Sequence, residues 1–237
     1  MSTFITKVGE GSDAYFELTQ TGIFVSIILI FLLIVTVAML KSAPVNEEGE
    51  VVPKKKIFNV KQLVFSAVSL ALAFALSYVK IFRMPWGGSV TLCSMLFVTI
   101  IGYWYGPTIG LISAFAYGLL QFVQGGSSYM LSLNQVAMDY IVAFAALGLS
   151  GFFSRKKNGL LTGYLVGIFF RGLFHSIGGY LYWMDYMPEN FPQSLAWIYP
   201  VAYNYAYIIA EGIITVIIIS LPPVKKALTK VKEMALS

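Results

Sequence analysis

The sequence predicts an all-α integral membrane protein, and its composition and the length of its apolar segments are the observations that predict it. Of the 237 residues, 58% are hydrophobic and 11% are charged, and the mean hydropathy is +0.77. A soluble domain carries about 25% charged residues, whereas a helix that crosses a bilayer needs about 20 mostly apolar residues. We therefore expect six or seven membrane helices with short connections and no separate soluble catalytic domain.

Seven apolar segments account for most of the chain. They span residues 22–40, 63–80, 89–105, 107–123, 131–153, 160–183 and 198–221. The first lacks the basic flank of a secretory signal, so we expect it to be retained as an extra N-terminal membrane helix. The predicted regions are 1–59, with this helix and a charged cytoplasmic linker; 60–223, with six helices; and 224–237, a basic cytoplasmic tail.

The basic residues indicate the orientation. Twelve of the sixteen fall in the linker, in the loop after residue 153 and in the tail. These are Lys41, Lys54, Lys55, Lys56, Lys61, Arg155, Lys156, Lys157, Lys225, Lys226, Lys230 and Lys232. Seven crossings with the N-terminus outside place all twelve on the cytoplasmic side, as the positive-inside rule requires. The other four are Lys7, Lys80, Arg83 and Arg171.

Four polar residues inside the apolar segments mark a candidate site: Asp139, His175, Asn204 and Glu211. A carboxylate at membrane depth costs roughly 2.5–3.5 kcal/mol to insert, which favours a functional role. At about 1.5 Å per residue, the first three lie in the outer half of the membrane and Glu211 near its middle. The alternative is that these groups only form hydrogen bonds between helices.

Aromatic residues surround these polar groups. They are Trp86, Tyr129, Tyr182, Trp183, Trp197, Tyr199, Tyr203 and Tyr207. Trp and Tyr also gather at membrane interfaces without any function. However, a desolvated cation over such a ring gains about 2 kcal/mol, and a buried cation needs a counter-charge. Acids and aromatic rings together predict a pocket, open to the exterior, for a small cationic ring-shaped molecule.

Other functional classes find less support in the sequence. It contains no Walker A motif, nucleophile elbow or HExxH motif, so a transporter of this kind would lack its own ATP motor. One histidine and one cysteine cannot supply the usual metal ligands, and the net charge of +5 follows from the positive-inside rule without nucleic acid as a partner. An ion-coupled carrier, a partner-driven binding protein and an intramembrane enzyme using Asp139 and His175 remain open, the last without a nucleophile or metal to support it.

Alanines recur at four-residue spacing in the segment 63–80: Ala67, Ala71 and Ala75. Small residues at this spacing form one helical stripe that another helix can approach closely. Ordinary internal packing and a docking face for another membrane subunit are the two alternatives.

Five stretches in order carry a family resemblance. They are RMPWGGSVTLCSM (83–95), YGPTIGLISAFAYGLLQ (105–121), LNQVAMDYIVAFAALGLSG (133–151), FRGLFHSIGGYLYW (170–183) and YNYAYIIAEGIIT (203–215). With them, residues 60–223 resemble the energy-coupling factor (ECF) thiamine transporters, the substrate-binding S components of the ThiT/YuaJ family. The resemblance implies a six-helix bundle in a bacterial cell membrane that binds thiamine near its outer surface, with residues 81–89 as a lid.

The resemblance also implies site residues and partners. The substrate-binding positions are Trp86, Tyr129, Asp139, Tyr140, His175, Trp183, Tyr199 and Asn204, and Glu211 joins them because of its depth. Some members carry an acid shortly after the lid tryptophan, where this chain has Val90 and Thr91. The implied partners are a transmembrane coupling subunit, docked at the alanine stripe, and two ATP-binding subunits; no cofactor is expected, since thiamine is the transported ligand. An S component for another vitamin or a thiamine precursor is the alternative, as is a stand-alone carrier of a small cationic heterocycle.

Overall fold

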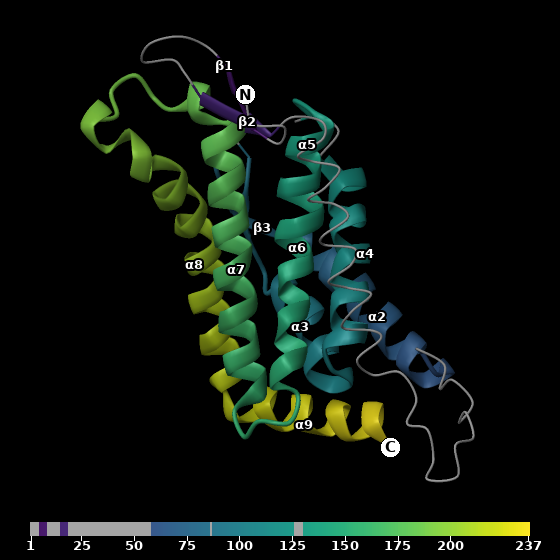
Figure 1. Cartoon of the computed structure of the whole chain (residues 1–237). Coiled ribbons are helices and arrows are strands. Elements are labelled where there is room, and N and C mark those ends of the chain that lie inside the picture. The colour runs from purple at the N-terminus through teal and green to yellow at the C-terminus, as the bar shows by residue number, and fades with distance from the viewer. Residues whose placement is uncertain (1–4, 9–14, 19–57, 86, 126–129) are drawn as a thin grey trace, which may run out of the picture. The chain divides into compact units, whose positions relative to one another are not determined.

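The chain forms two compact units, residues 1–57 and residues 58–237. The computed structural model describes residues 5–8, 15–18 and 58–237, apart from residues 86 and 126–129 (Figure 1). In the first unit, strand β1 (Ile5–Val8) pairs antiparallel with strand β2 (Tyr15–Leu18). These strands were not expected from the sequence. The helix predicted at 22–40 lies outside the described residues.

The second unit is a bundle of helices with two short strands. Its elements in chain order are α2 (Val60–Ser77), β3 (Lys80–Arg83), β4 (Ser89–Thr91), α3 (Ser94–Tyr105), α4 (Pro107–Gly125), α5 (Leu133–Val136), η3 (Ala137–Val142), α6 (Ala143–Ala145), η4 (Ala146–Phe153), α7 (Gly159–Tyr182), η5 (Met184–Tyr186), η6 (Gln193–Ile198), α8 (Tyr199–Ser220) and α9 (Pro222–Leu236). The segments α5, η3, α6 and η4 follow one another without a break, so they form one composite helix.

Five helical spans among the described residues are long and apolar enough to cross a membrane. They are Val60–Ser77, Pro107–Gly125, Leu133–Phe153, Gly159–Tyr182 and Gln193–Ser220. Five of the predicted segments correspond to α2, α4, the composite helix, α7 and α8. Both ends of each segment lie within three residues of the ends of its helix. Helix α3 is apolar but has only 12 residues, about 18 Å at 1.5 Å per residue. It is therefore shorter than the roughly 30 Å hydrocarbon core of a bilayer.

The prediction of one helix over 89–105 is wrong for its first five residues. Ser89–Thr91 is strand β4, which pairs antiparallel with β3. Gly87 and Gly88, with φ of 93° and 80°, lie in the turn that joins the two strands. Cys93 has a left-handed φ of 58°, so the helix begins only after it. Residues 81–89, the expected lid, thus form most of a β-hairpin.

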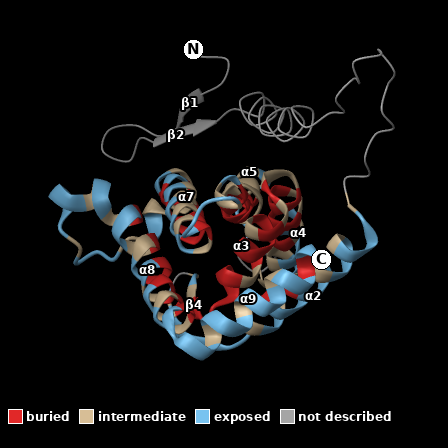
Figure 2. Cartoon of the chain, turned by 90° about the horizontal axis from the view of Figure 1, so that it is seen from below, coloured by how far each residue is buried: buried red, intermediate tan, exposed pale blue. Residues whose placement is uncertain are grey.

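Helix α3 lies at the centre of the bundle, and buried residues gather on it and on the helix faces turned toward it (Figure 2). Glycines allow the close packing around it. A Cβ on Gly148 would lie 2.6 Å from the backbone of Leu111, and one on Gly110 would lie 2.7 Å from the Cα of Gly102. Backbones that approach this closely are typical of helices packed in membranes.

Helix α9, in the region predicted as a basic tail, runs across one end of the bundle (Figures 1 and 2). Ala235 is buried beside Trp104 of α3. Lys232 donates a hydrogen bond from Nζ to the Tyr103 hydroxyl at 2.8 Å and lies 4.1 Å from the centroid of that ring. These contacts cover the C-terminal end of the short helix α3.

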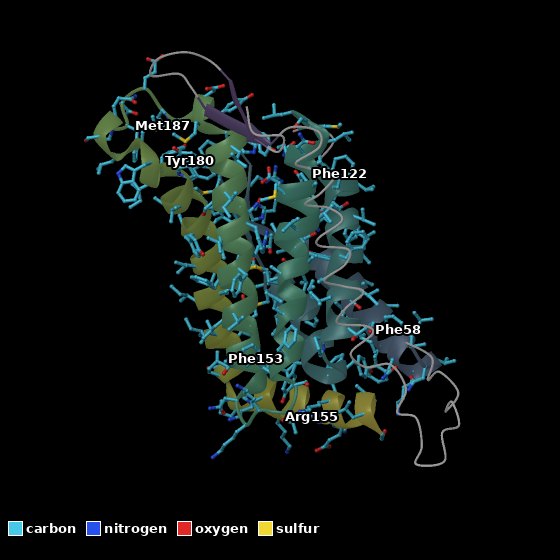
Figure 3. All side chains as sticks on the ribbon, in the orientation of Figure 1. Phe58, Phe122, Phe153, Arg155, Tyr180 and Met187 are labelled. Atoms are coloured by element: carbon cyan, nitrogen blue, oxygen red, sulfur yellow. The ribbon has the colours of Figure 1, made fainter. Side chains whose placement is uncertain are left out.

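The two ends of the bundle differ in their side chains. Phe153 and Arg155 lie at the end that carries α9, whereas Tyr180 and Met187 lie at the other (Figure 3). We call these the α9 end and the open end.

Candidate ligand-binding site

A cavity of about 290 Å³ lies among the helices of the second unit. Its lining comes from the end of α2, the β3–β4 hairpin, α4, the composite helix, α7 and α8. This volume is at the lower edge of the roughly 300–1,000 Å³ typical of small-molecule pockets. The cavity therefore fits a small organic ligand.

Seven of the nine predicted binding residues line this cavity. They are Asp139, Tyr140, His175, Trp183, Tyr199, Asn204 and Glu211. Trp86 and Tyr129 lie outside the described residues, so their contacts stay predictions. Residues that are up to 72 positions apart in the sequence thus share one cavity.

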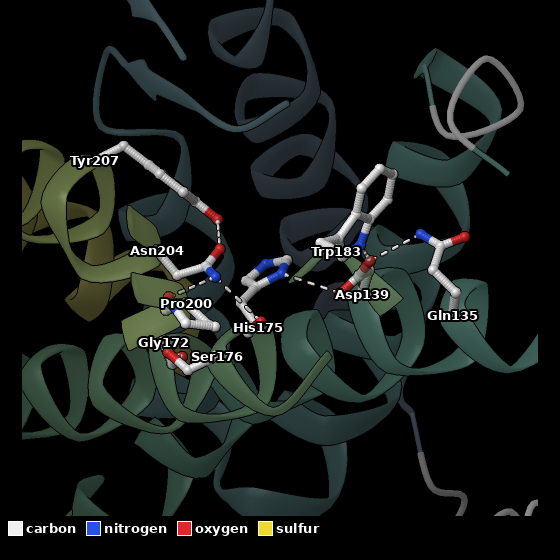
Figure 4. A network of polar contacts seen from close by, with 9 residues as sticks. All are labelled: Gln135, Asp139, Gly172, His175, Ser176, Trp183, Pro200, Asn204 and Tyr207. Atoms are coloured by element: carbon white, nitrogen blue, oxygen red, sulfur yellow. Dashed lines mark hydrogen bonds and ion pairs between the residues drawn. The ribbon is translucent and has the colours of Figure 1, made fainter. Parts of the chain in front are cut away.

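Asp139 is held from two directions. It lies in the π-helical segment η3 and is 8% exposed. Its Oδ2 accepts hydrogen bonds from Gln135 Nε2 at 2.7 Å and from Trp183 Nε1 at 2.9 Å (Figure 4). Its Oδ1 lies 3.7 Å from His175 Nδ1. Gly178 of α7 allows this approach, since a Cβ there would lie 2.5 Å from Oδ1. The carboxylate is therefore fixed, and one oxygen keeps acceptor capacity.

His175 is one turn of α7 away from Arg171 and lies between aromatic rings. The centroids of Phe144 and Tyr207 are 6.0 Å and 6.4 Å from its own, both in edge-on arrangements. Its separation from Asp139 exceeds an ordinary hydrogen bond, and its Nε2 has no hydrogen-bond partner among the described residues. A buried polar atom without a partner calls for an explanation, and a bound ligand would supply one.

Asn204 joins α7 to α8. Its Nδ2 donates to the His175 carbonyl at 3.2 Å and to the Pro200 carbonyl at 2.9 Å, and its Oδ1 accepts from the Tyr207 hydroxyl at 3.0 Å (Figure 4). Both amide hydrogens are thus engaged, while a carbonyl oxygen has a second lone pair. Any contact from Asn204 to a ligand would use that lone pair.

Glu211 has four hydrogen-bond donors around it and is 2% exposed. Its carboxylate accepts from Thr91 N at 3.0 Å, Thr91 Oγ1 at 2.6 Å, Ser94 Oγ at 3.2 Å and Met95 N at 3.2 Å. An acidic group at a helix N-terminus accepts hydrogen bonds from the free N–H groups there and interacts favourably with the positive end of the helix dipole. Glu211 therefore fixes the hairpin and the start of α3 to α8. Its predicted contact with a ligand stays a prediction.

Aromatic rings line the wall formed by α8 and the composite helix. Tyr140 stacks on Phe144 with an interplanar angle of 15°. Tyr199, Tyr203 and Tyr207 follow one another along α8 with centroids 5.7 Å and 6.5 Å apart. By contrast, Trp197, which was also expected near the site, is 65% exposed.

The hairpin turn is tied to this wall. The Tyr203 hydroxyl donates to the Gly87 carbonyl at 3.0 Å. A Cβ on Gly88 would lie 2.6 Å from the Tyr207 ring, so only glycine fits there without a shift. The hairpin thus packs on the aromatic face of α8.

Arg171 belongs to the site although it was not predicted as a site residue from the sequence. It lines the cavity, is 9% exposed and holds its guanidinium 4.3 Å from the centroid of the Phe144 ring. The reasoning that selected Asp139 applies equally to an arginine inside an apolar segment. The buried lining therefore carries two acids, Asp139 and Glu211, and one base, Arg171. The formal charges of these three buried groups sum to −1, while Lys80 and Arg83 add two positive charges at exposed positions of the lining.

A model of a known protein family matches most of the second unit. A sequence model of the family described as thiamine transporter protein (Thia_YuaJ) matches residues 63–231. This chain belongs to the thiamine transporter family.

Two similar proteins agree with the family assignment. Thiamine transporter ThiT of Bacillus subtilis (strain 168) is 31% identical over 175 residues, which cover 68% of this chain and 88% of the relative. The solved structure of ThiT from Listeria monocytogenes is 24% identical, with a TM-score of 0.54 over 68% of this chain and 94% of that chain. At that identity the structural match shows the fold. The predicted family and the predicted all-α, multi-pass membrane fold are confirmed.

Proposed function

We propose that this chain is the substrate-binding S component of an ECF transporter, which binds thiamine from outside the cell and mediates its ATP-driven uptake with partner subunits. The observation that carries the proposal is the position of Asp139 beside Trp183 and His175 in a cavity whose buried charges sum to −1. The thiazolium ring of thiamine has a permanent positive charge. A carboxylate and an aromatic face are the groups that stabilise such a cation away from water.

The proposed roles follow from the partners already described. Asp139 supplies the counter-charge through Oδ1, the oxygen that accepts no hydrogen bond from the described residues. His175 offers its unpartnered Nε2 to a ring nitrogen or amino group, and Trp183, Tyr140 and Tyr199 provide ring faces. Trp86 and Tyr129 complete the proposed contacts, and no cofactor takes part.

The proposed orientation puts the open end outside and the α9 end in the cytoplasm of a bacterial cell. Arg155 lies at the α9 end, as does the helix that carries Lys225, Lys226 and Lys230 (Figure 3). Basic residues favour the cytoplasmic side of a membrane. If the chain crosses the membrane seven times, its N-terminus would then lie outside the cell.

The proposed partners are a transmembrane coupling subunit and two ATP-binding subunits. Helix α2 supports a docking role because its polar residues point inward: Ser66, Ser69 and Ser77 are buried, whereas Ala67, Ala71 and Ala75 are exposed. Val64 and Val68, 52% and 56% exposed, flank the alanines. The stripe is therefore exposed on the surface of the second unit, and its small side chains would let another helix approach closely.

Ala71→Trp should abolish thiamine uptake in vesicles that contain all four subunits while leaving thiamine binding to the purified chain intact. A bulky side chain would hold the partner helix away without touching the cavity. Leu119→Trp, at a 45% exposed position of α4, is the matched control and should transport normally. Uptake by vesicles without the ATP-binding subunits would instead favour the stand-alone carrier.

Thiamine should quench the tryptophan fluorescence of the purified protein, because Trp183 lines the cavity. The quench should shrink strongly in Trp183→Phe. A panel of thiamine, its separate pyrimidine and thiazole parts and riboflavin distinguishes a thiamine site from one for a precursor or another vitamin. Quenching by riboflavin alone would refute the thiamine assignment.

A further inference from the structure

Helix α9 differs in composition from the helices that it adjoins. Its 15 residues include four lysines and one glutamate, whereas the five spans long enough to cross a membrane are apolar. Leu221 alone joins α9 to α8, and its extended ψ of 129° turns the chain there. Because α9 then runs across the end of the bundle (Figure 1), it stays close to the level at which α8 ends.

Aromatic residues mark this level as a membrane–water interface. Tyr103, Trp104 and Tyr105 form the end of α3, and all three lie against α9. Lys232 donates to the Tyr103 hydroxyl, and Ala235 packs beside Trp104. The Tyr105 hydroxyl donates to the Ala235 carbonyl at 3.3 Å. Since Trp and Tyr gather at the depth of the lipid headgroups, α9 lies at that depth.

One face of α9 packs on the bundle, and an apolar stripe flanks that face. Leu228 is half-buried and Ala235 is buried, and both belong to the core around α3. At 3.6 residues per turn, Ala227, Val231 and Met234 form one stripe beside this face, and all three are exposed. Such an apolar stripe is typical of helices that lie in the interface and turn it toward the acyl chains.

A lysine stripe follows on the far side of the apolar stripe. Lys226 and Lys230 lie one turn apart, and both are exposed. Among the described residues the single ion pair joins His175 to Asp139, so neither lysine is paired with a carboxylate. The two lysines can therefore bind an anion outside the described part of the chain.

The rest of the α9 end is also cationic. Arg155 lies there (Figure 3), and Lys61 reaches it through a hydrogen bond from Nζ to the Ser237 Oγ at 3.0 Å. The start of α2, the turn before α7 and α9 itself carry one acid, Glu233, and eight basic residues: Lys61, Arg155, Lys156, Lys157, Lys225, Lys226, Lys230 and Lys232. A surface of this charge attracts anions.

We propose that α9 is an interfacial helix that binds anionic phospholipid headgroups through Lys226 and Lys230, with Val231 and Met234 against the acyl chains. Lysine binds phosphate as a point charge, and basic residues beside a membrane span attract anionic lipids. A lipid surface satisfies the lysine stripe and the apolar stripe together. The proposal goes beyond the proposed function, because none of these four residues lines the cavity.

The test is a titration of the detergent-purified full-length protein with phosphatidylglycerol, which is anionic, or with neutral phosphatidylcholine of the same chains. Native mass spectrometry counts the bound lipids. The wild type should bind phosphatidylglycerol at least about fivefold more tightly than phosphatidylcholine. K226A/K230A should bind phosphatidylglycerol about tenfold more weakly and phosphatidylcholine unchanged, because it loses only charge at the headgroups. Salt should reduce the preference.

R155A/K157A is the matched control, since it removes two exposed cations from the same end of the bundle but not from α9. It should weaken phosphatidylglycerol binding less than about threefold. Equal losses in the two double variants would indicate diffuse attraction by the whole end and would overturn a site on α9. Unchanged lipid binding by K226A/K230A would overturn it too, and weaker assembly of that variant with partner subunits would assign the lysines to a protein.

A fluorescent label tests the position of the helix separately. Met234→Cys and Glu233→Cys place the label on adjacent residues that lie on different stripes of α9. Cys93 is buried and should stay unlabelled. In vesicles, lipids with a quencher on the acyl chain should quench the label at position 234 more strongly than the label at position 233. Equal quenching at the two positions would overturn the interfacial position of α9.

Discussion

Asp139→Asn should weaken thiamine binding roughly thirtyfold or more. The substitution keeps the shape of the side chain and lets its amide oxygen still accept from Gln135 and Trp183, the two present donors. What it removes is the negative charge that we propose lies opposite the thiazolium ring. Truncating one partner of a buried charge pair costs about 2–5 kcal/mol, and each 1.4 kcal/mol is a factor of about ten in affinity.

Two comparisons make this result specific to the buried charge. Asp185→Asn removes the same charge from an exposed position two residues after Trp183, and it should change the affinity less than twofold. A neutral analogue of thiamine should bind the two proteins almost equally, because it gains nothing from the carboxylate. Unchanged thiamine affinity in Asp139→Asn, measured by calorimetry, would exclude the proposed role.

Glu211→Ala should lower the free energy of unfolding by about 2–5 kcal/mol and reduce thiamine binding with it. Two backbone donors, Thr91 N and Met95 N, lose their buried acceptor, and an unpaired buried donor costs about 1–3 kcal/mol. The hairpin then loses its link to α8 near the cavity. Thermal unfolding in detergent measures the change.

The free energy of unfolding of Glu211→Gln should lie between those of the wild type and Glu211→Ala. The amide oxygen can still accept hydrogen bonds, while the amide nitrogen cannot. The control Glu233→Ala, at an exposed position of α9, should leave the free energy of unfolding unchanged. If saturating thiamine restores the full stability of Glu211→Ala, the carboxylate acts only on the fold. A Glu211→Ala protein that is as stable as the wild type would show that the four hydrogen bonds are unimportant.

Much of the membrane fold was predictable because a bilayer imposes simple rules. Length and apolarity alone delimit a helix such as α7, whose observed ends differ by one residue from the predicted 160–183. The same physics selects Asp139 and His175, since a polar group inside such a segment is costly unless it has a use. Helical spacing then brings them to a similar depth. The helix bounds and the choice of Asp139 and His175 therefore need no knowledge of tertiary contacts.

The rest depends on contacts between distant segments. Residues 89–93 were predicted as the start of a helix. However, Glu211, more than 110 residues away, accepts hydrogen bonds from Thr91 in β4 and from the backbone N–H of Met95 in the first turn of α3. Asn204 could be placed by depth, but not its bonds to α7 and to Tyr207. Arg171 could have been selected by the rule used for Asp139, and its stacking on Phe144 shows how a buried guanidinium is accommodated.

Calorimetric titration of the purified full-length protein with thiamine tests the central claim most directly. We predict one saturable site, with binding heat that disappears when the cavity is blocked by bulk, for example in Gly179→Trp, whose glycine lines the cavity. Absence of any saturable heat from a folded protein, or equal heat from the cavity-blocked variant, would contradict the assignment of this cavity as a thiamine site.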